Sequence, residues 1–247
     1  MKKNNVWELV DRPKNQNVVT SRWVFVTKRK PDTTIDRYKA RLVARGFTQL
    51  YGVDYNETYA PVVNCASIRM LFAYAAANKL AIGQFDVKTA FLNGKLDETI
   101  YMEQPKGFES GENLVCLLKR SLYGLKQAPR QWNICFTNTI KELGLSVSEH
   151  DECIFYRHEP LIIIGIYVDD GIVISNDHVN IRRVMEKLRM YFEMHDAYPK
   201  AYLVFQIRRE VDSVLLYQQS YVQKILKRFG MEKCKPCLLY TSPSPRD

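Results

Sequence analysis

The stretch IGIYVDDGIVI (residues 164–174) places two adjacent aspartates, Asp169 and Asp170, between two apolar runs. Each run is short and rich in β-branched residues, which is typical of a buried strand. The Asp-Gly pair at 170–171 favours a tight turn, because glycine adopts the positive φ of such turns without strain. The pattern predicts a β-hairpin with an acidic tip. Two readings of the tip stay open: a solvated acidic turn, or a rigid pair of carboxylates that holds divalent cations, since Mg²⁺ prefers oxygen ligands.

Charge is unevenly distributed along the chain. The 247 residues carry a net charge of +9, and the first fifty contain twelve Lys or Arg residues against four Asp or Glu residues. Such a region suits a polyanionic partner such as nucleic acid or a triphosphate, although a solvated basic face has the same composition. A hydrophobic content of 46% allows a sizeable core, in one large domain or two lobes. No apolar run reaches the roughly 20 residues that a membrane span needs, and we expect no membrane partner.

The six cysteines are scattered, and only Cys234 and Cys237 have a metal-like spacing. A zinc site would need a second pair, so we expect free thiols in a reducing compartment.

Hydrophobic periodicity and turn residues predict the order of the elements. They are a basic hairpin (17–47), a helix capped by Ser67 (67–80), a strand that ends near Asp86, a helix (128–144), the acidic hairpin, and two further helices (177–192 and 220–230). Strands alternate irregularly with helices, and no Gly-rich phosphate loop occurs. We therefore expect an α+β fold whose helices lie on one face of a sheet.

Asp86 gives the acidic hairpin a potential partner. A carboxylate at this strand end, facing two more at the hairpin tip, could hold two Mg²⁺ ions about 4 Å apart, as in metal-assisted phosphoryl transfer. Taken alone, Asp86 fits a capping or surface role better. Further motifs are needed to favour a metal site formed by Asp86 and the acidic hairpin.

Several long motifs favour the metal-site interpretation. They are YKARLVARGFTQ (38–49), ETYAPVV (57–63), QFDVKTAFLNG (84–94), YMEQPKGF (101–108), SLYGLKQAPRQW (121–132) and YVDD (167–170). In this order they resemble the reverse transcriptase domain of copia-type LTR retrotransposon Pol polyproteins, from about residue 7 to 236 within an expected domain 1–236. The resemblance implies a right-hand polymerase fold. Its basic fingers would span about 7–80 and part of the region after 100, and its palm would lie around 81–95 and 121–210.

The resemblance also assigns the acidic residues. Asp86 matches motif A, and Asp169 and Asp170 match motif C, the carboxylates that hold two Mg²⁺ ions, with Mn²⁺ as the alternative. Asp86 and Asp169 are expected as direct ligands and Asp170 in support. The implied reaction is attack of a primer 3′-hydroxyl on the α-phosphate of a dNTP, with release of pyrophosphate.

Other roles follow from the same resemblance. Lys39 and Arg41 match the fingers residues that contact the triphosphate. Phe91 matches the bulky aromatic that excludes a ribose 2′-hydroxyl, and its alternative is a core phenylalanine. Gly124 and Gln127 match motif B, where a missing side chain lets the backbone approach nucleotide and template.

Two departures from the family pattern cluster near the C-terminal end. HDAY (195–198) stands where the family usually has Lys-Asp-Leu-Gly, and Leu203-Val204 stands where it usually has a Leu-Gly turn that grips the primer. A valine in place of a positive-φ glycine would be strained. His195 is retained as a candidate general acid, because histidine titrates near neutral pH.

The last eleven residues, CLLYTSPSPRD (237–247), do not follow the family pattern. They resemble the translation of a sequencing adapter, and we expect a disordered artefact there, with a disordered natural tail as the alternative.

The resulting functional prediction is a reverse transcriptase, a nucleotidyltransferase that uses an RNA or DNA template, a primer and dNTPs. We expect it to act in cytoplasmic virus-like particles or in the nucleus, without the protease, integrase and RNase H segments of its polyprotein. The alternative is a catalytically decayed relic that still binds nucleic acid. A two-metal nuclease is a weaker reading, because that class needs neither motif B nor Phe91.

Overall fold

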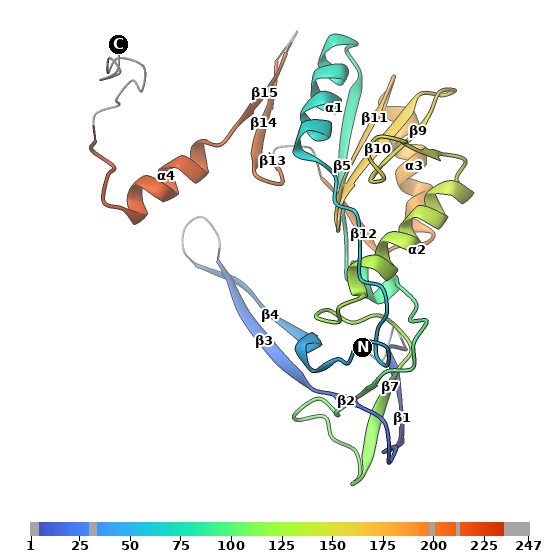
Figure 1. Ribbon diagram of the computed structural model, residues 1–247. Coiled ribbons are helices and arrows are strands. Elements are labelled where there is room, and N and C mark those ends of the chain that lie inside the picture. Colours follow the sequence, from blue (N-terminus) through green and yellow to red (C-terminus); the bar gives the residue numbers. More distant parts are fainter. Residues whose placement is uncertain (1–4, 30–33, 198–200, 211–212, 235–247) are drawn as a thin grey trace, which may run out of the picture. The chain divides into compact units, whose positions relative to one another are not determined.

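The computed structural model describes residues 5–29, 34–197, 201–210 and 213–234. The chain divides into two compact units, residues 1–198 and 199–247, and each unit is described by itself (Figure 1). This boundary falls inside the segment 121–210 that was expected to belong to one palm. No helix in the described ranges is long and apolar enough to cross a bilayer.

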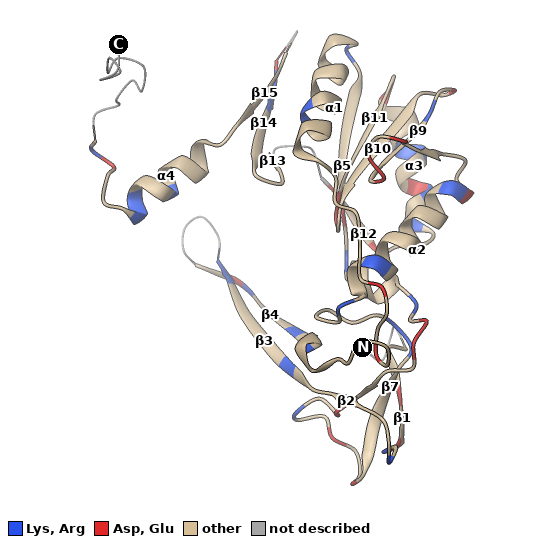
Figure 2. Cartoon of the chain, viewed as in Figure 1, with Lys and Arg blue, Asp and Glu red and all other residues tan. Residues whose placement is uncertain are grey.

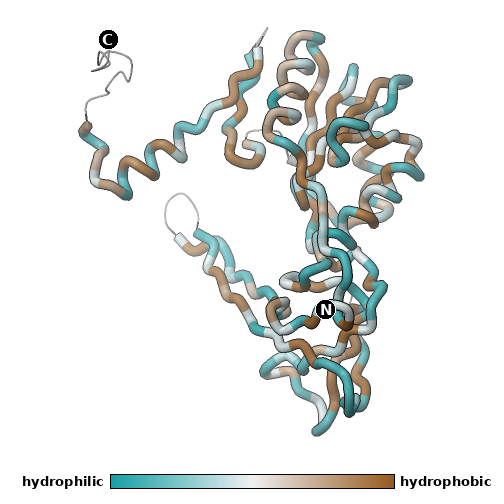
Figure 3. The backbone as a smooth tube through the Cα atoms, in the orientation of Figure 1, coloured by the Kyte–Doolittle hydropathy of each residue, from teal (hydrophilic) through white to brown (hydrophobic). Residues whose placement is uncertain are grey.

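A six-stranded antiparallel sheet lies at the centre of the first unit. Its strands are, in spatial order, β12 (Met194–Ala197), β5 (Ala81–Val87), β11 (Asp170–Ser175), β10 (Ile162–Tyr167), β9 (Ile154–Arg157) and β8 (Ser146–Val147). Three helices pack on it: α1 (Cys65–Ala77), α2 (Ala128–Glu142) and α3 (His178–Arg189). The strands of this sheet and the helices on it contain apolar stretches (Figure 3). The expected α+β class agrees with this mixture.

The helices cover both faces of the sheet, which corrects the expectation of one covered face. Gly165 of β10 lies against Leu71 of α1, and Gly83 of β5 lies against Ile181 of α3. These two glycines pair with successive residues of β11, 172 and 173, whose side chains point to opposite faces. Both faces are covered because the central strands are apolar on both sides, and each apolar face must be shielded from water.

A four-stranded sheet and a separate two-stranded sheet complete the first unit. The four strands are β1 (Trp7–Asp11), β7 (Leu114–Leu118), β6 (Tyr101–Met102) and β2 (Val18–Val19). The other sheet, which we call the basic hairpin, pairs β3 (Ser21–Arg29) with β4 (Ile35–Ala44). This confirms the predicted hairpin, and its expected Pro-Asp turn lies outside the described residues.

The helix ends follow from local sequence. Asn64 caps α1, since its Oδ1 accepts a hydrogen bond from the Ala66 N–H at 2.9 Å, so the cap expected at Ser67 was placed too late. In α2, Pro129 occupies the first turn as predicted, and Gly144 follows the helix end with φ +79°.

The second unit contains β13 (Ala201–Tyr202), β14 (Phe205–Arg209), β15 (Val214–Tyr217) and α4 (Gln219–Arg228). Leu203 and Val204 form the turn between β13 and β14. The residue with positive φ is Leu203, at +55°, so the strain expected at Val204 was assigned to the wrong residue. Leu203, the first residue of the turn, has the left-handed backbone conformation. Val204 does not, and its side chain is exposed.

The acidic hairpin forms, but its turn lies two residues before the Asp-Gly pair at 170–171 that was expected to form it. Tyr167 and Asp170 are the last paired residues, so Val168 and Asp169 make the turn. Val168 adopts φ +56°, and its carbonyl oxygen accepts a hydrogen bond of 2.6 Å from Trp132 Nε1.

Gly171 is therefore a strand residue, opposite Phe85 of β5. A Cβ atom there would lie 2.1 Å from Phe85 Cζ. Glycine is needed at position 171 because any side chain there would occupy the space of the Phe85 ring. It is not needed to form the turn.

We expect Gly171→Ala to lower the free energy of unfolding by roughly 2–3 kcal/mol, as overpacked cores do. Gly165→Ala is the matched control, because its new methyl group would meet the mobile end of Leu71 at 3.2 Å. Denaturant unfolding should show a clearly smaller loss for the control, and Phe85→Leu should recover part of the loss in Gly171→Ala. Equal losses in the two alanine variants would contradict this account.

Candidate active site

Three aspartates meet where β5 ends and β11 begins. Asp86 is directly opposite Asp170 in the antiparallel pair, and such residues project from the same face of a sheet. Asp169 lies in the adjoining turn, and its carbonyl oxygen accepts a 2.8 Å hydrogen bond from the Val87 N–H. The structure thus brings together the three acidic residues that the sequence singled out.

Burial and neighbouring negative charge raise the pKa of two of these aspartates. Burial, and then the charges of Asp169 and Asp86, raise the pKa of Asp170 to about 6. Burial and the charge of Asp86 also raise the pKa of Asp169, while Lys39 and Arg41 act in the opposite direction. A group of acids in this environment favours a bound cation, since positive charge relieves both the desolvation and the repulsion.

Carboxylate oxygens are of the ligand type that Mg²⁺ prefers. Within the described ranges, no group of three or more His, Cys, Asp or Glu side chains is placed so that it could hold a metal ion by itself. Mg²⁺ is commonly held by one or two carboxylates together with substrate phosphates and water. In that arrangement one or two of Asp86, Asp169 and Asp170 would be ligands, and phosphate and water oxygens would supply the remaining positions.

The basic hairpin supplies opposite charge. Lys39 and Arg41 are two residues apart on β4, so both project from one face of the hairpin. Burial and the neighbouring cations, Arg41 first, lower the pKa of Lys39, and Asp86 acts against them. Figure 2 shows basic segments along β3 and β4 and acidic segments at the strand ends of the sheet. The two expected triphosphate contacts therefore lie within electrostatic reach of the aspartates.

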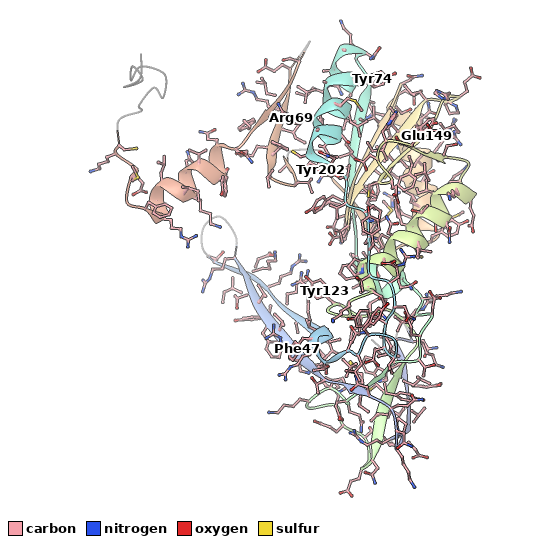
Figure 4. The ribbon with its side chains drawn as sticks, in the orientation of Figure 1. Phe47, Arg69, Tyr74, Tyr123, Glu149 and Tyr202 are labelled. Atoms are coloured by element: carbon pink, nitrogen blue, oxygen red, sulfur yellow. The ribbon has the colours of Figure 1, made fainter. Side chains whose placement is uncertain are left out.

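Phe91 lies on a short 3-10 helix, η3 (Ala90–Asn93), four residues after β5 ends. It is half-buried and packs against the core cluster beneath it. Its ring also contacts Tyr123, with centroids 5.3 Å apart. Tyr123 is 53% exposed and lies on the loop before α2 (Figure 4). Sequence reasoning missed Tyr123, whose only signal was its place beside Gly124.

The structure shows a packing requirement for Gly124, and its expected role beside nucleotide and template stays a prediction. It has φ +95°, and a Cβ atom on it would lie 2.2 Å from the carbonyl oxygen of Ala44, the last residue of β4. The missing side chain lets the loop backbone approach the basic hairpin.

The expected nucleotide contact by Gln127 is corrected. Its side chain has no exposed surface, and a buried side chain cannot touch a bound nucleotide. Its amide is bonded within the protein, donating to the Asp54 carbonyl oxygen (2.8 Å) and Glu98 Oε2 (3.0 Å) and accepting from Gln49 Nε2 (3.0 Å).

His195 on β12 is exposed and directly opposite Asp86, on the other side from Asp170. The structure thus places it beside the acidic residues. Leu203 and Val204 belong to the second unit, and their role in gripping a primer stays a prediction.

Asp170→Asn should stabilise the metal-free protein at pH 8 and change little at pH 4. The folded pKa of about 6 lies above the reference value of 3.8, so the folded state binds more protons between these values and loses stability as the pH rises through them. With solvent screening taken into account, this loss in the free energy of unfolding is about 1–2 kcal/mol. The neutral amide of the Asp170→Asn variant avoids it.

Thermal melts in EDTA at both pH values test this expectation, and saturating Mg²⁺ should erase the difference at pH 8. An unchanged or lower melting temperature for Asp170→Asn at pH 8 would show that the carboxylates do not repel one another.

Comparison with known proteins identifies the family. The family model described as reverse transcriptase (RNA-dependent DNA polymerase) matches residues 4–243. This match runs past residue 236 into the tail expected to be an artefact, which lies outside the described residues. Residues 199–247 form the second unit, so the match also takes in most of that unit.

Relatives of the chain are retrotransposon polyproteins. It is 40% identical to the retrovirus-related Pol polyprotein from transposon TNT 1-94 of Nicotiana tabacum, over 96% of this chain and 18% of the relative. It is 36% identical to that from transposon RE1 of Arabidopsis thaliana, over 98% of this chain and 17% of the relative. The transposon Ty1-GR3 Gag-Pol polyprotein of Saccharomyces cerevisiae is 30% identical, over 69% of this chain and 9% of the relative. The chain spans less than a fifth of each of these relatives, and it belongs to the reverse transcriptase family of retrotransposon Pol polyproteins.

Proposed function

We propose that this chain is the polymerase portion of a Pol polyprotein and adds dNTPs to a primer 3′ end on an RNA or DNA template. The observation that carries the proposal is the direct pairing of Asp86 with Asp170, with Asp169 in the adjoining turn. The family supports the class of reaction. The sheet that bears the aspartates corresponds to a palm, and the basic hairpin corresponds to fingers.

The reaction is an in-line displacement. The primer 3′-oxygen forms a bond to the α-phosphorus of the dNTP, and the bond from that phosphorus to the pyrophosphate oxygen breaks. Asp86 and Asp169, with Asp170 in support, would hold two divalent cations, which when bound activate the hydroxyl and neutralise charge on the leaving group.

The remaining roles belong to side chains of the chain itself. Lys39 and Arg41 bind the triphosphate and offset the negative charge that grows on pyrophosphate. We assign His195 as the general acid for departing pyrophosphate, because it is exposed beside Asp86 and histidine exchanges protons near neutral pH. Phe91, held by Tyr123, forms the wall against a ribose 2′-hydroxyl.

Asp86→Asn and Asp169→Asn should each reduce Mg²⁺-dependent primer extension about a hundredfold or more, because each removes a charge that holds the cations. Extension of oligo(dT) on poly(rA) measures this loss, and circular dichroism checks the fold. Asp11→Asn is the matched control, since Asp11 is an exposed strand residue on β1.

Near wild-type extension by either site variant would refute the assigned roles. A folded wild-type chain that binds the primer–template but extends nothing would identify a decayed relic.

Phe91→Val should raise the kcat/KM for rUTP relative to dTTP about 10- to 100-fold, because a shortened wall no longer clashes with the 2′-oxygen. Leu92→Ala is the matched control, as Leu92 is partly buried against the same core cluster. It should lower the melting temperature without changing the rUTP/dTTP ratio. If Phe91→Val also destabilises the protein but leaves the ratio unchanged, Phe91 is only a core residue.

A further inference from the structure

A network of buried amides joins the segment just after the basic hairpin to the loop before α2. Gln49 and Gln127 are 4% and 0% exposed, although they are 78 residues apart in the chain. Gln49 Nε2 donates to Gln127 Oε1 at 3.0 Å, and Gln49 Oε1 accepts from the Lys126 N–H at 2.8 Å. Both ends of the Gln49 amide therefore bind residues of the loop.

Main-chain contacts complete this connection. The Ala44 N–H donates to the Tyr123 carbonyl oxygen at 2.8 Å, and Gly46 packs so closely that a Cβ atom on it would lie 2.3 Å from the Gly124 carbonyl oxygen. We call this set of contacts, together with the Gln49–Gln127 pair, the amide clasp. It holds the end of β4, the strand that carries Lys39 and Arg41.

The clasp is anchored beyond its two glutamines. Gln127 also donates to the Asp54 carbonyl oxygen and to Glu98. The carboxylate of Asp54 is itself buried, and its Oδ2 accepts from the Leu50 N–H at 2.8 Å and from Asn17 Nδ2 at 2.5 Å. A buried polar network of this kind fixes one arrangement, because each broken bond leaves an unpaired buried group.

The basic hairpin depends on such a base. Strands β3 and β4 pair only with each other among the described strands, and most of β4 before Leu42 is exposed. A two-stranded hairpin has little stability of its own in water. The position of Lys39 and Arg41 relative to the aspartates is therefore set where the hairpin joins the rest of its unit.

We propose that Gln49 is a positioning residue, which through the amide clasp holds the triphosphate-binding face of the basic hairpin over the aspartates. This inference rests on the proposed polymerase function. Loss of the clasp lets the base of β4 shift, so Lys39 and Arg41 bind the triphosphate less well. The primer–template and the carboxylates keep their own contacts.

Gln49→Met tests the proposal, because it preserves side-chain length and removes both hydrogen bonds. Gln131→Met is the matched control: Gln131 is a buried glutamine of α2 whose Nε2 donates to Asp97 Oδ2 at 2.9 Å, outside the clasp. The measurements are kcat and KM for dTTP, KM for the primer–template, melting temperature, and the rate of tryptic cleavage within β4 without substrates.

We expect Gln49→Met to raise the KM for dTTP about tenfold, as misplaced binding groups do. The KM for the primer–template should stay unchanged, and trypsin should cut within β4 faster. Gln131→Met should lower the melting temperature as much as Gln49→Met does. It should change neither the KM for dTTP nor the rate of tryptic cleavage within β4. If Gln49→Met does not fold, Gln49→Glu replaces it, because a carboxylate keeps the acceptor for Lys126 and loses the donor to Gln127.

An unchanged KM for dTTP, with only kcat and melting temperature reduced as in the control, would overturn the positioning role. The proteolysis result separates this failure from that of the polymerase proposal. If the wild-type chain extends no primer, unchanged cleavage within β4 in the Gln49 variant overturns the clasp, and faster cleavage supports it.

Discussion

The pairing of β5 with β11 is the constraint on which the candidate site depends. It sets Asp86 directly opposite Asp170, although two acidic side chains on neighbouring strands repel each other. The register is held by packing one residue further along, where the Phe85 ring fills the space above Gly171. A shift by one residue would turn Phe85 out of the core. Apolar packing therefore holds together charges that would otherwise separate, and burial, followed by the repulsion from Asp169 and Asp86, raises the pKa of Asp170.

Opposite charge comes from a distant part of the same unit. The basic hairpin brings Lys39 and Arg41 within electrostatic reach of Asp169, but it is too exposed to hold this position through a core of its own. Its base is fixed instead by buried amides and by close main-chain contacts at Gly46 and Gly124. The unit thus uses apolar packing to fix its acidic residues and buried hydrogen bonds to fix its basic ones. Hydrogen bonds are directional, so they define the orientation of an element that has little surface to bury.

Much of this organisation could be predicted from the sequence. The basic and acidic hairpins, the helices at 128–144 and 177–192, and the family itself follow from periodicity, turn residues and long motifs. The errors share a physical cause. The Asp-Gly pair was assigned to a turn because glycine has that local preference, whereas Gly171 is required by the Phe85 ring. Gln127 was expected at the nucleotide because of its motif, whereas its amide is bonded to segments more than seventy residues away in the chain.

The sequence by itself determined which residues carry charge, which segments are apolar, and that three aspartates lie at strand ends. These properties depend on residue type and on spacing along the chain. Only the tertiary structure decided which aspartates pair, which helix covers which face, and that Tyr123 packs on Phe91. It also decided that the glycines at 124 and 171 serve close approach between segments. Such contacts join residues far apart in the chain, and no local propensity specifies them, because each depends on the space left by the other partner.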